Sequence, residues 1–173
     1  YYVKTFGGLE ITNDNVTVNI VELFGKQLVN LLQVLLFHSE KPVQKDELID
    51  IPRPESKNPS SALKFSIFRL RAELNEIEFF KDKEVIVTTR KGYILNPNLD
   101  WNIDFVELEK AYNQINDGSE LLDEKEFKTA RKIFRLYQGR FYASPSQLHW
   151  ILQKQEIFRQ MYVKTMMRIS CYL

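Results

Sequence analysis

Apolar residues in the segment 58–74 recur with spacings of four, three and four, which is the period of one face of an α-helix. These apolar positions are Leu63, Ile67, Leu70 and Leu74. We predict that the helix begins at Asn58, because asparagine is a good N-cap and Pro59 takes a position where its missing N–H has no partner. The pattern therefore predicts an amphipathic helix with a narrow buried stripe and a broad exposed face.

Two other patterns precede this helix. The first twenty residues are rich in β-branched and aromatic residues and are interrupted by glycine and asparagine turn residues, which predicts three short antiparallel strands. Leucines at helical spacing then predict a largely buried helix over residues 24–40. A shorter helix is expected over about residues 44–51, and it cannot continue through the loop 51–57, which holds two prolines.

A β-hairpin is predicted after the helix, over residues 84–95, because apolar residues flank a turn at Arg90, Lys91 and Gly92. Glycine supplies the positive φ that a short hairpin loop needs. The order of strands, three helices and a hairpin with a basic tip is the layout of a winged helix-turn-helix. In such a layout a helix fits the major groove of DNA, and a cationic tip reaches neighbouring phosphates or the minor groove.

The remaining residues, from 98 onward, read as helices only. Asp104 and Glu107 resemble a capping box at the start of the first helix, and Gly139 is expected to stop the second. The expected inward-facing residues are Phe105, Leu108, Tyr112 and Ile115 in the first helix, and Phe127, Ala130, Phe134 and Tyr137 in the second. A long third helix closes the chain. Small residues where helices should cross closely, such as Ala111 and Ala130, indicate a tetratricopeptide-like array.

One face of the predicted helix 58–74 is free of carboxylates. No acidic residue occurs from residue 58 through residue 71, although acidic residues follow at once. At ~100° per residue, the side chains that lie opposite the apolar stripe or on its flank are Ser61, Lys64, Phe65, Phe68, Arg69, Arg71 and Ala72. This face favours a DNA-recognition helix. The alternative is an amphipathic surface helix whose cations are solvated.

Bulk composition leaves that choice open, because 24 basic and 23 acidic residues give a net charge of only +1. The 173 residues, 44% hydrophobic and 27% charged, are typical of a soluble chain of one or two small domains. The single cysteine, Cys171, excludes an internal disulfide and suits a reducing cytoplasm, where we expect the protein. No apolar run approaches the ~20 residues that span a bilayer. Both ends interrupt a predicted element, so we expect the natural protein to continue in both directions.

Side chains for catalysis are sparse. His38 and His149 are the only histidines, and neither belongs to a cluster with metal-ligand spacing. Cys171 has no His or Asp near it in the sequence, and no glycine-rich phosphate loop is present. We therefore expect no enzymatic activity, no metal and no cofactor.

Residues 1–97 resemble the OmpR-type winged-helix domain. The resemblance rests on FGGLEI, PVQKDELI, ALKFSIFRLRAEL and VTTRKGYIL, together with the leucine-rich first helix. The chain departs from the family at residues 50–52, where the sequence DIP replaces the usual Leu-Trp that closes the second helix. It also departs at the wing, where Arg90 and Lys91 replace a glycine that often begins the turn.

Residues 98–173 are similar to the bacterial transcriptional activator domain, through WNIDFVELEKAY, ARKIFRLYQGRFYAS and WILQKQEIFRQMYVKTMMRIS. That domain accompanies the OmpR-type module in antibiotic-regulatory-protein-like regulators and normally carries further helices, so it is incomplete here. The two resemblances imply an α+β chain: a winged helix-turn-helix with N-terminal antiparallel strands, followed by an all-α tetratricopeptide-like domain. The expected domains are residues 1–97 and residues 98–173.

The resemblance also implies roles for individual residues. The positions expected to face DNA are Ser61, Lys64, Phe65, Phe68, Arg69 and Arg71 in the helix, and Thr89, Arg90 and Lys91 in the wing. Phe65 is expected to touch a thymine methyl or sugar edges, while packing against the wing or a neighbouring helix is the alternative for Phe65 and Phe68. Arg53 and Lys57 match the loop that touches RNA polymerase in relatives, and a solvated loop is the alternative for them.

Two hypotheses of function follow. The first is a sequence-specific transcriptional regulator that binds double-stranded DNA, with the helical region transmitting or receiving a signal. In the family that the chain resembles, two copies commonly bind head to tail on direct repeats, so a homodimer on DNA is expected. The alternative is a protein–protein interaction module, in which the winged helix and the helical array bind another protein. A concentration of cations on the predicted helix and on the hairpin tip favours the first.

Overall fold

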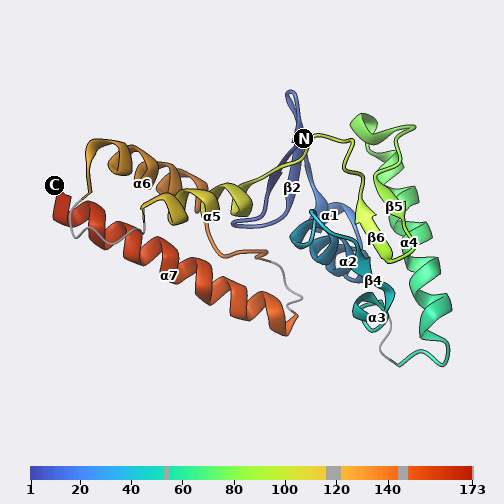
Figure 1. Cartoon of the computed structure of the whole chain (residues 1–173). Coiled ribbons are helices and arrows are strands. Elements are labelled where there is room, and N and C mark those ends of the chain that lie inside the picture. Colours follow the sequence, from blue (N-terminus) through green and yellow to red (C-terminus); the bar gives the residue numbers. More distant parts are fainter. Residues whose placement is uncertain (53–54, 116–121, 144–147, 173) are drawn as a thin grey trace. The chain divides into compact units, whose positions relative to one another are not determined.

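The computed structural model describes residues 1–52, 55–115, 122–143 and 148–172. The chain forms two compact units (Figure 1). Unit 1 comprises Tyr1 and Asn13–Trp101, and unit 2 comprises Tyr2–Thr12 and Asn102–Leu173. The expected domain boundary lies at residue 97, while the compact units divide at Trp101 and group the first two strands with the helical region.

The described part of unit 1 contains the short strand β3 (Val16–Asn19) and five helical segments. The helices are α1 (Ile20–Leu23), α2 (Lys26–Phe37), α3 (Lys45–Leu48), α4 (Pro59–Glu76) and the 3-10 helix η1 (Glu78–Phe80). The core forms around the leucine-rich helix α2, whose apolar side chains contact α4 and strand β6. The expected buried helix is therefore present, and its leucines exclude water from the centre of the unit.

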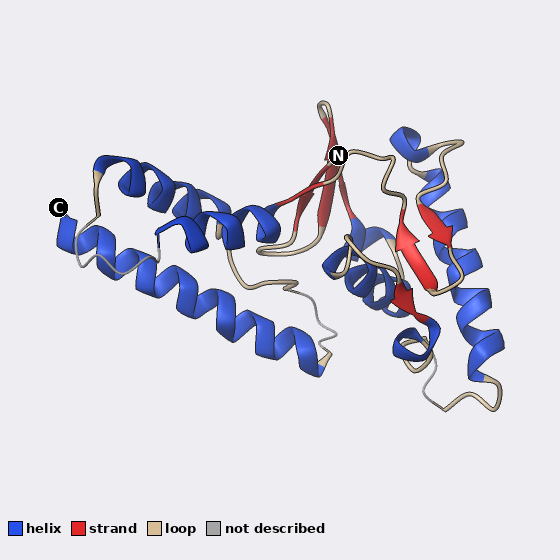
Figure 2. Cartoon of the chain, in the orientation of Figure 1, coloured by secondary structure: helices blue, strands red, loops and turns tan. Residues whose placement is uncertain are grey.

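A three-stranded antiparallel sheet completes unit 1 (Figure 2), in the order β4 (Val43–Gln44), β6 (Gly92–Leu95), β5 (Ile86–Thr88). In this sheet Thr88 and Val43 both pair with Tyr93. The hairpin β5–β6 is the predicted wing, and helices α2, α3 and α4 form the predicted three-helix part. The winged helix-turn-helix expected from the sequence is thus confirmed as the fold of unit 1.

Helix α4 agrees with its prediction at both the start and the core face. The Asn58 side chain accepts a hydrogen bond from the Ser61 backbone N–H at 3.2 Å, and Pro59 is the first helical residue. The four residues of the predicted apolar stripe are all buried, at 2% exposure or less: Leu63, Ile67, Leu70 and Leu74. On the opposite face of α4, Ser61, Lys64, Phe65, Phe68 and Arg69 are exposed.

Over its described residues, unit 2 combines three strands with three helices. Strand β1 (Tyr2–Lys4) lies between β2 (Glu10–Asn13), with which it is antiparallel, and β7 (Asn102–Ile103), with which it is parallel. The helices are α5 (Asp104–Ile115), α6 (Glu124–Leu136) and α7 (His149–Tyr172) (Figure 1). The interpretation that strands end before residue 98 is wrong, because β7 pairs with a strand about a hundred positions earlier in the chain.

Aromatic rings form the centre of unit 2. Phe6 is fully buried, and its ring meets that of Phe158 edge-on at 5.3 Å between centroids. Phe141 lies 4.9 Å from Phe158 and forms a β-bridge with Phe6. The segment that follows β1 is therefore built into the helical unit, where edge-to-face contacts between rings add to the burial of apolar area.

Two details of the helices in unit 2 differ from expectation. Phe134 was predicted to face inward, but it is 49% exposed, and Ala130 and Ile133 are the buried residues of α6. The predicted capping box at Asp104 is also wrong, since Asp104 is the first helical residue and its carboxylate accepts hydrogen bonds from Thr5 and Phe6, which follow β1. A capping box does occur at α6, where the Asp123 and Glu126 side chains bond reciprocally to each other's backbone N–H. Within the described residues, no helix is both long and apolar enough to cross a membrane.

Candidate nucleic-acid interface

The face of α4 that points away from the core carries the predicted DNA-facing side chains. Five of them are exposed: Ser61, Lys64, Phe65, Phe68 and Arg69. Phe65 and Phe68 are 57% and 68% exposed, so more than half of each side chain is open to solvent. Exposed aromatic rings beside cations form a mixed apolar and cationic surface, which we interpret as a candidate interaction site.

The cations of this face have no acidic partners. In the described part of unit 1 no ion pair is found, and the first turn of α4 holds no carboxylate. Lys64 and Arg69 are therefore available to an external anion. The helix N-terminus adds a partial positive charge beside Ser60 and Ser61, which are exposed there.

The wing tip presents two more exposed cations, Arg90 and Lys91. The turn is held by Thr89, whose side-chain oxygen accepts hydrogen bonds from the backbone N–H groups of Lys91 at 3.2 Å and Gly92 at 3.1 Å. Thr89 also donates its backbone N–H to the Gly92 carbonyl at 2.7 Å. The structure thus gives Thr89 a role in shaping the turn, while the two cations extend beyond it.

Gly92 is required by the approach of the wing to strand β4. Its φ is +153°, and a methyl group added there would lie 1.8 Å from the Val43 carbonyl oxygen. No side chain fits that space. Glycine is therefore needed at this position for two reasons, the positive φ predicted from the sequence and the close approach to β4.

Arg71 differs from the other predicted contacts because its side chain is used inside unit 1. Its Nε donates to the Ile86 carbonyl at 3.1 Å, and its Nη2 donates to the Thr88 hydroxyl at 2.8 Å. The guanidinium also lies 6.0 Å from the centroid of the Tyr93 ring. Arg71 therefore joins α4 to both strands of the wing, and it is half-buried rather than exposed.

Lys45 was not singled out by the sequence analysis. It is the first residue of α3, it is exposed, and its Nζ lies 6.0 Å from the centroid of the same Tyr93 ring. The sequence signal that could have pointed to Lys45 is a cation at the first position of the short helix α3, which precedes the predicted recognition helix. Of the two loop residues expected to meet RNA polymerase, Lys57 is exposed and Arg53 lies outside the described residues.

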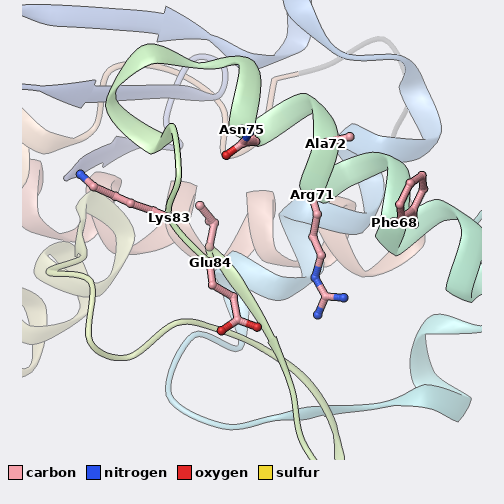
Figure 3. Close-up of a pocket in the computed structure, with 7 residues that line it drawn as sticks. Phe68, Arg71, Ala72, Asn75, Lys83 and Glu84 are labelled. Atoms are coloured by element: carbon pink, nitrogen blue, oxygen red, sulfur yellow. The ribbon is translucent and has the colours of Figure 1, made fainter.

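A shallow pocket of about 340 Å³ opens between the C-terminal half of α4 and the segment leading into β5 (Figure 3). Its lining residues are Phe68, Arg71, Ala72, Asn75, Lys83, Glu84 and Val85. Lys83 donates to the Tyr1 hydroxyl at 2.6 Å and to the Phe79 carbonyl at 2.9 Å, so its charge is partly satisfied within the unit. In the part of the chain that the structure describes, no cluster of His, Cys, Asp and Glu could hold a metal ion.

Fold and surface together define a class of protein: a winged helix-turn-helix with an open cationic face, followed by a helical domain. A solved structure of the same fold is that of Mycobacterium tuberculosis EmbR in complex with a low-affinity phosphopeptide, which matches 95% of this chain with a TM-score of 0.66 and 16% sequence identity. This chain covers 42% of that protein, so it spans less than half of its length. The fold that the two resemblances imply, a winged helix followed by a helical domain, is confirmed by this likeness.

A second solved structure, the DNA-binding domain of E. coli CadC, matches 54% of this chain and is covered to 88%, with 24% identity and a TM-score of 0.40. Neither the comparison with protein-family models nor that with curated proteins gives a match.

Proposed function

We propose that this chain is a sequence-specific DNA-binding transcriptional regulator, in which α4 enters the major groove and the wing contacts phosphates or the minor groove. The observation that carries the proposal is the set of unpaired cations, Lys64 and Arg69 on α4 and Arg90 and Lys91 on the wing. DNA phosphates are the anions that such a helix-and-wing surface fits. The function is not catalytic, and it needs no metal or cofactor.

The roles of the exposed side chains follow from their chemistry. Arg69 offers the paired donors that recognise guanine, and Phe65 offers an apolar edge to a thymine methyl. Ser61 and Lys64, near the start of α4, are suited to phosphates. The residues that we propose to contact DNA directly are Ser61, Lys64, Phe65, Phe68, Arg69, Arg90 and Lys91.

The test is a binding titration on DNA selected from a genomic fragment library, with the salt concentration varied. Arg69→Ala is expected to weaken specific binding by ~1–3 kcal/mol and Lys64→Ala by the same amount or less. Lys128→Ala is the matched control, because Lys128 is an exposed helical lysine of unit 2 that pairs with Glu124 at 2.9 Å. The assignment of α4 is wrong if the Lys64/Arg69 double variant keeps its affinity and its circular dichroism spectrum.

The wing is expected to contribute charge more than sequence. Replacing both Arg90 and Lys91 with alanine should weaken binding to all sequences alike and flatten the salt dependence by up to ~0.9 per lost phosphate contact. A loss confined to one operator, with the salt slope unchanged, would show that the tip reads bases.

One recognition helix covers too few base pairs to select a site from a genome, so we propose that two copies bind direct repeats. The repeats should lie about 10–11 base pairs apart, so that both helices enter the major groove from one side. Inserting about five base pairs rotates one repeat to the opposite face and should abolish the preference for the tandem site. The helical region is proposed to hold the second copy or to receive a signal, and the loop with Arg53 and Lys57 is proposed to meet RNA polymerase.

The second candidate function, a protein-interaction module, is favoured by the two exposed phenylalanines of α4. Protein interfaces are enriched in aromatic residues, whereas phosphate contacts need none. Binding measurements on two variants distinguish the two candidate functions. A DNA-binding surface loses affinity for DNA with Arg69→Ala, whereas a protein-binding surface loses its partner with Phe65→Ala and shows no specific DNA site at all.

A further inference from the structure

The contacts of Arg71 assign it a different role from that of the neighbouring cations. Arg71 and Arg69 are two positions apart on α4, yet Arg69 is exposed, while Arg71 donates to Ile86 at 3.1 Å and to Thr88 at 2.8 Å. We propose that Arg71 is a positioning residue that fixes the wing against α4, and that it does not contact DNA itself. The inference rests on the proposed function, since it explains how two DNA-contacting elements are held at one spacing.

The carbonyl that Arg71 reaches belongs to the open edge of the sheet. Strand β5 is an edge strand, because the sheet order is β4-β6-β5. Val85 accepts from the Asn96 N–H at 2.8 Å and Thr89 donates to the Gly92 carbonyl at 2.7 Å, so these alternate residues face β6. Backbone groups of the residues between them point outward in an antiparallel pair. The outward carbonyl of Ile86 is therefore left without a strand partner, and Arg71 supplies one.

The same guanidinium also meets the inner strand of the wing. Its centre lies 6.0 Å from the centroid of the Tyr93 ring, and the Lys45 ammonium lies at 6.0 Å from that centroid as well. Tyr93 is only 4% exposed, so cations from α3 and α4 approach a ring that is largely shielded from water. Cation–π attraction strengthens when the pair is partly desolvated. Arg71 is thus bound to β5 through hydrogen bonds and to β6 through the ring.

A planar guanidinium suits this arrangement, because Nε and Nη2 are two separate donors on one rigid plane and reach the Ile86 carbonyl and the Thr88 hydroxyl from different nitrogens. A lysine at this position would have to reach both acceptors from one nitrogen, so we expect it to replace Arg71 poorly. If α4 and the wing form one preorganised surface, DNA binding does not have to order the wing first. Losing that order lowers affinity without removing a contact to DNA.

The experiment compares Arg71→Ala, Arg71→Lys and Arg69→Ala in the full chain, by titration of the DNA site at several salt concentrations. Both Arg71 variants are expected to weaken binding by about tenfold, with the salt slope of the wild type. Arg69→Ala is expected to lower the slope by up to ~0.9. A phosphate contact would give the opposite result: Arg71→Lys would keep the wild-type affinity, and Arg71→Ala would lower the slope. That outcome overturns the proposal.

A second readout needs no DNA. In the free protein, ¹⁵N relaxation of the Arg90 and Lys91 amides should show increased motion in both Arg71 variants and in Thr88→Val, which removes one hydrogen bond at an exposed position. Arg69→Ala should leave these amides unchanged. Unchanged relaxation in all the variants overturns the positioning role, even if the protein binds DNA. Absence of any DNA binding by the wild type defeats the proposed function instead and leaves this readout intact.

Coupling between Arg71 and the wing provides the last control. If Arg71 acts through the wing, Arg71→Ala should have little further effect in a chain that already carries Arg90→Ala and Lys91→Ala. Arg69→Ala should keep its full effect in that background, because distant, independent contacts are additive. Full additivity of Arg71→Ala with the wing variants would contradict the proposal.

Discussion

The two units carry similar charged residues and use them differently. In unit 2 cations meet carboxylates within 4 Å along and between helices, as in the pairs Lys132–Glu107 at 2.6 Å and Arg159–Glu156 at 2.8 Å. In the described part of unit 1 no such pair is found, although Lys64, Arg69 and the wing tip are exposed. The net charge of +1 averages these two arrangements. Whether a cation is available to bind an external anion therefore depends on whether a carboxylate already pairs with it, and the net charge does not show this.

The units also differ in what holds them together. Unit 1 relies on leucines of α2 and α4 around one apolar core. Unit 2 places aromatic rings at its centre and a fully buried carboxylate, Asp104, at the junction of its strands with α5. A buried carboxylate is costly unless its oxygens are hydrogen-bonded, so unit 2 depends on a few polar contacts more than unit 1 does. Substitutions can test each of these differences.

The largest loss of stability is expected from replacing a glycine that lies close to another backbone segment. We take one such glycine from each unit. Gly92→Ala places a methyl group 1.8 Å from the Val43 carbonyl oxygen, at a φ of +153°. It should lower the free energy of unfolding of unit 1 by about 3 kcal/mol or more. Gly139→Ala, at a φ of +138°, meets the Gly7 Cα at 3.1 Å and should cost unit 2 about 1–2 kcal/mol.

Fluorescence can separate the two unfolding transitions, because Trp101 belongs to unit 1 and Trp150 to unit 2. Urea titrations of the Trp101→Phe and Trp150→Phe backgrounds report one unit each. Gly25→Ala is the control, since a methyl group there has no heavy atom within 4 Å. Equal stability of the Gly92→Ala and Gly25→Ala chains would mean that the contact of the wing with β4 is not as close as the structure has it.

The next largest loss of stability is expected from replacing Asp104. Its carboxylate accepts hydrogen bonds from the Thr5 N–H at 2.8 Å, the Thr5 hydroxyl at 2.5 Å and the Phe6 N–H at 3.1 Å. Asp104→Ala leaves three buried donors without this acceptor and should destabilise unit 2 by about 3 kcal/mol. Asp104→Asn should cost far less, because the amide oxygen can accept from both N–H groups while its NH₂ donates to the Thr5 hydroxyl.

The contribution of Asp104 to the stability of unit 2 depends on pH, and the direction of its pKa shift gives the sign. Burial raises the pKa of Asp104 above its ordinary value of 3.8, although the hydrogen bonds from Thr5, Phe6 and Phe105 oppose the shift. The folded state then binds this proton more tightly than the unfolded state does. The contribution to stability is therefore fully present below pH 3.8 and is lost as pH rises through the raised pKa. Asp104→Asn should remove this component from the pH profile of unit 2, measured by Trp150 fluorescence. A profile identical to that of the wild type would contradict it.

Local patterns in the sequence predicted most of unit 1 and less of unit 2. The spacing of Leu63, Ile67, Leu70 and Leu74 predicted the buried face of α4, because helical period depends only on neighbouring residues. Gly92 of the wing turn was likewise predicted from the residues next to it. The hydrogen bonds of Asp104 with Thr5, and the two-residue strand β7, join positions about a hundred residues apart, and no local pattern encodes them.

The candidate interface was predicted as a surface but not side chain by side chain. Arg71 lies on the flank of the apolar stripe, where a long side chain can turn toward DNA or toward the wing, and periodicity does not distinguish these directions. The exposure of Phe134 escaped prediction for a similar reason, since its ring stacks near Tyr162 at 6.1 Å and still remains 49% exposed, and helical period does not give the depth of burial. Which residues touch DNA stays a prediction for the variants above to test.

The smallest expected change in stability, from removing one ion pair in unit 2, directly tests the contrast between paired and unpaired cations. Lys132 donates to Glu107 at 2.6 Å, and this hydrogen bond, more than the nearby charges, lowers the pKa of Glu107 below its ordinary value of 4.5. Glu107→Gln should cost unit 2 roughly 0.5 kcal/mol at neutral pH, because the pair is partly exposed. The cost should be present above pH 4.5 and fade as pH falls through the lowered pKa. Affinity for DNA should not change.

Lys64→Ala should show the reverse, with the unfolding free energy of unit 1 unchanged, the affinity for DNA reduced and the salt slope flattened by up to ~0.9. A paired cation then contributes to stability alone, and an unpaired cation contributes to binding alone. If Lys64→Ala instead shifts the Trp101 unfolding transition and leaves the DNA titration unchanged, then Lys64 serves the fold, and the contrast between the units is not one between structure and binding.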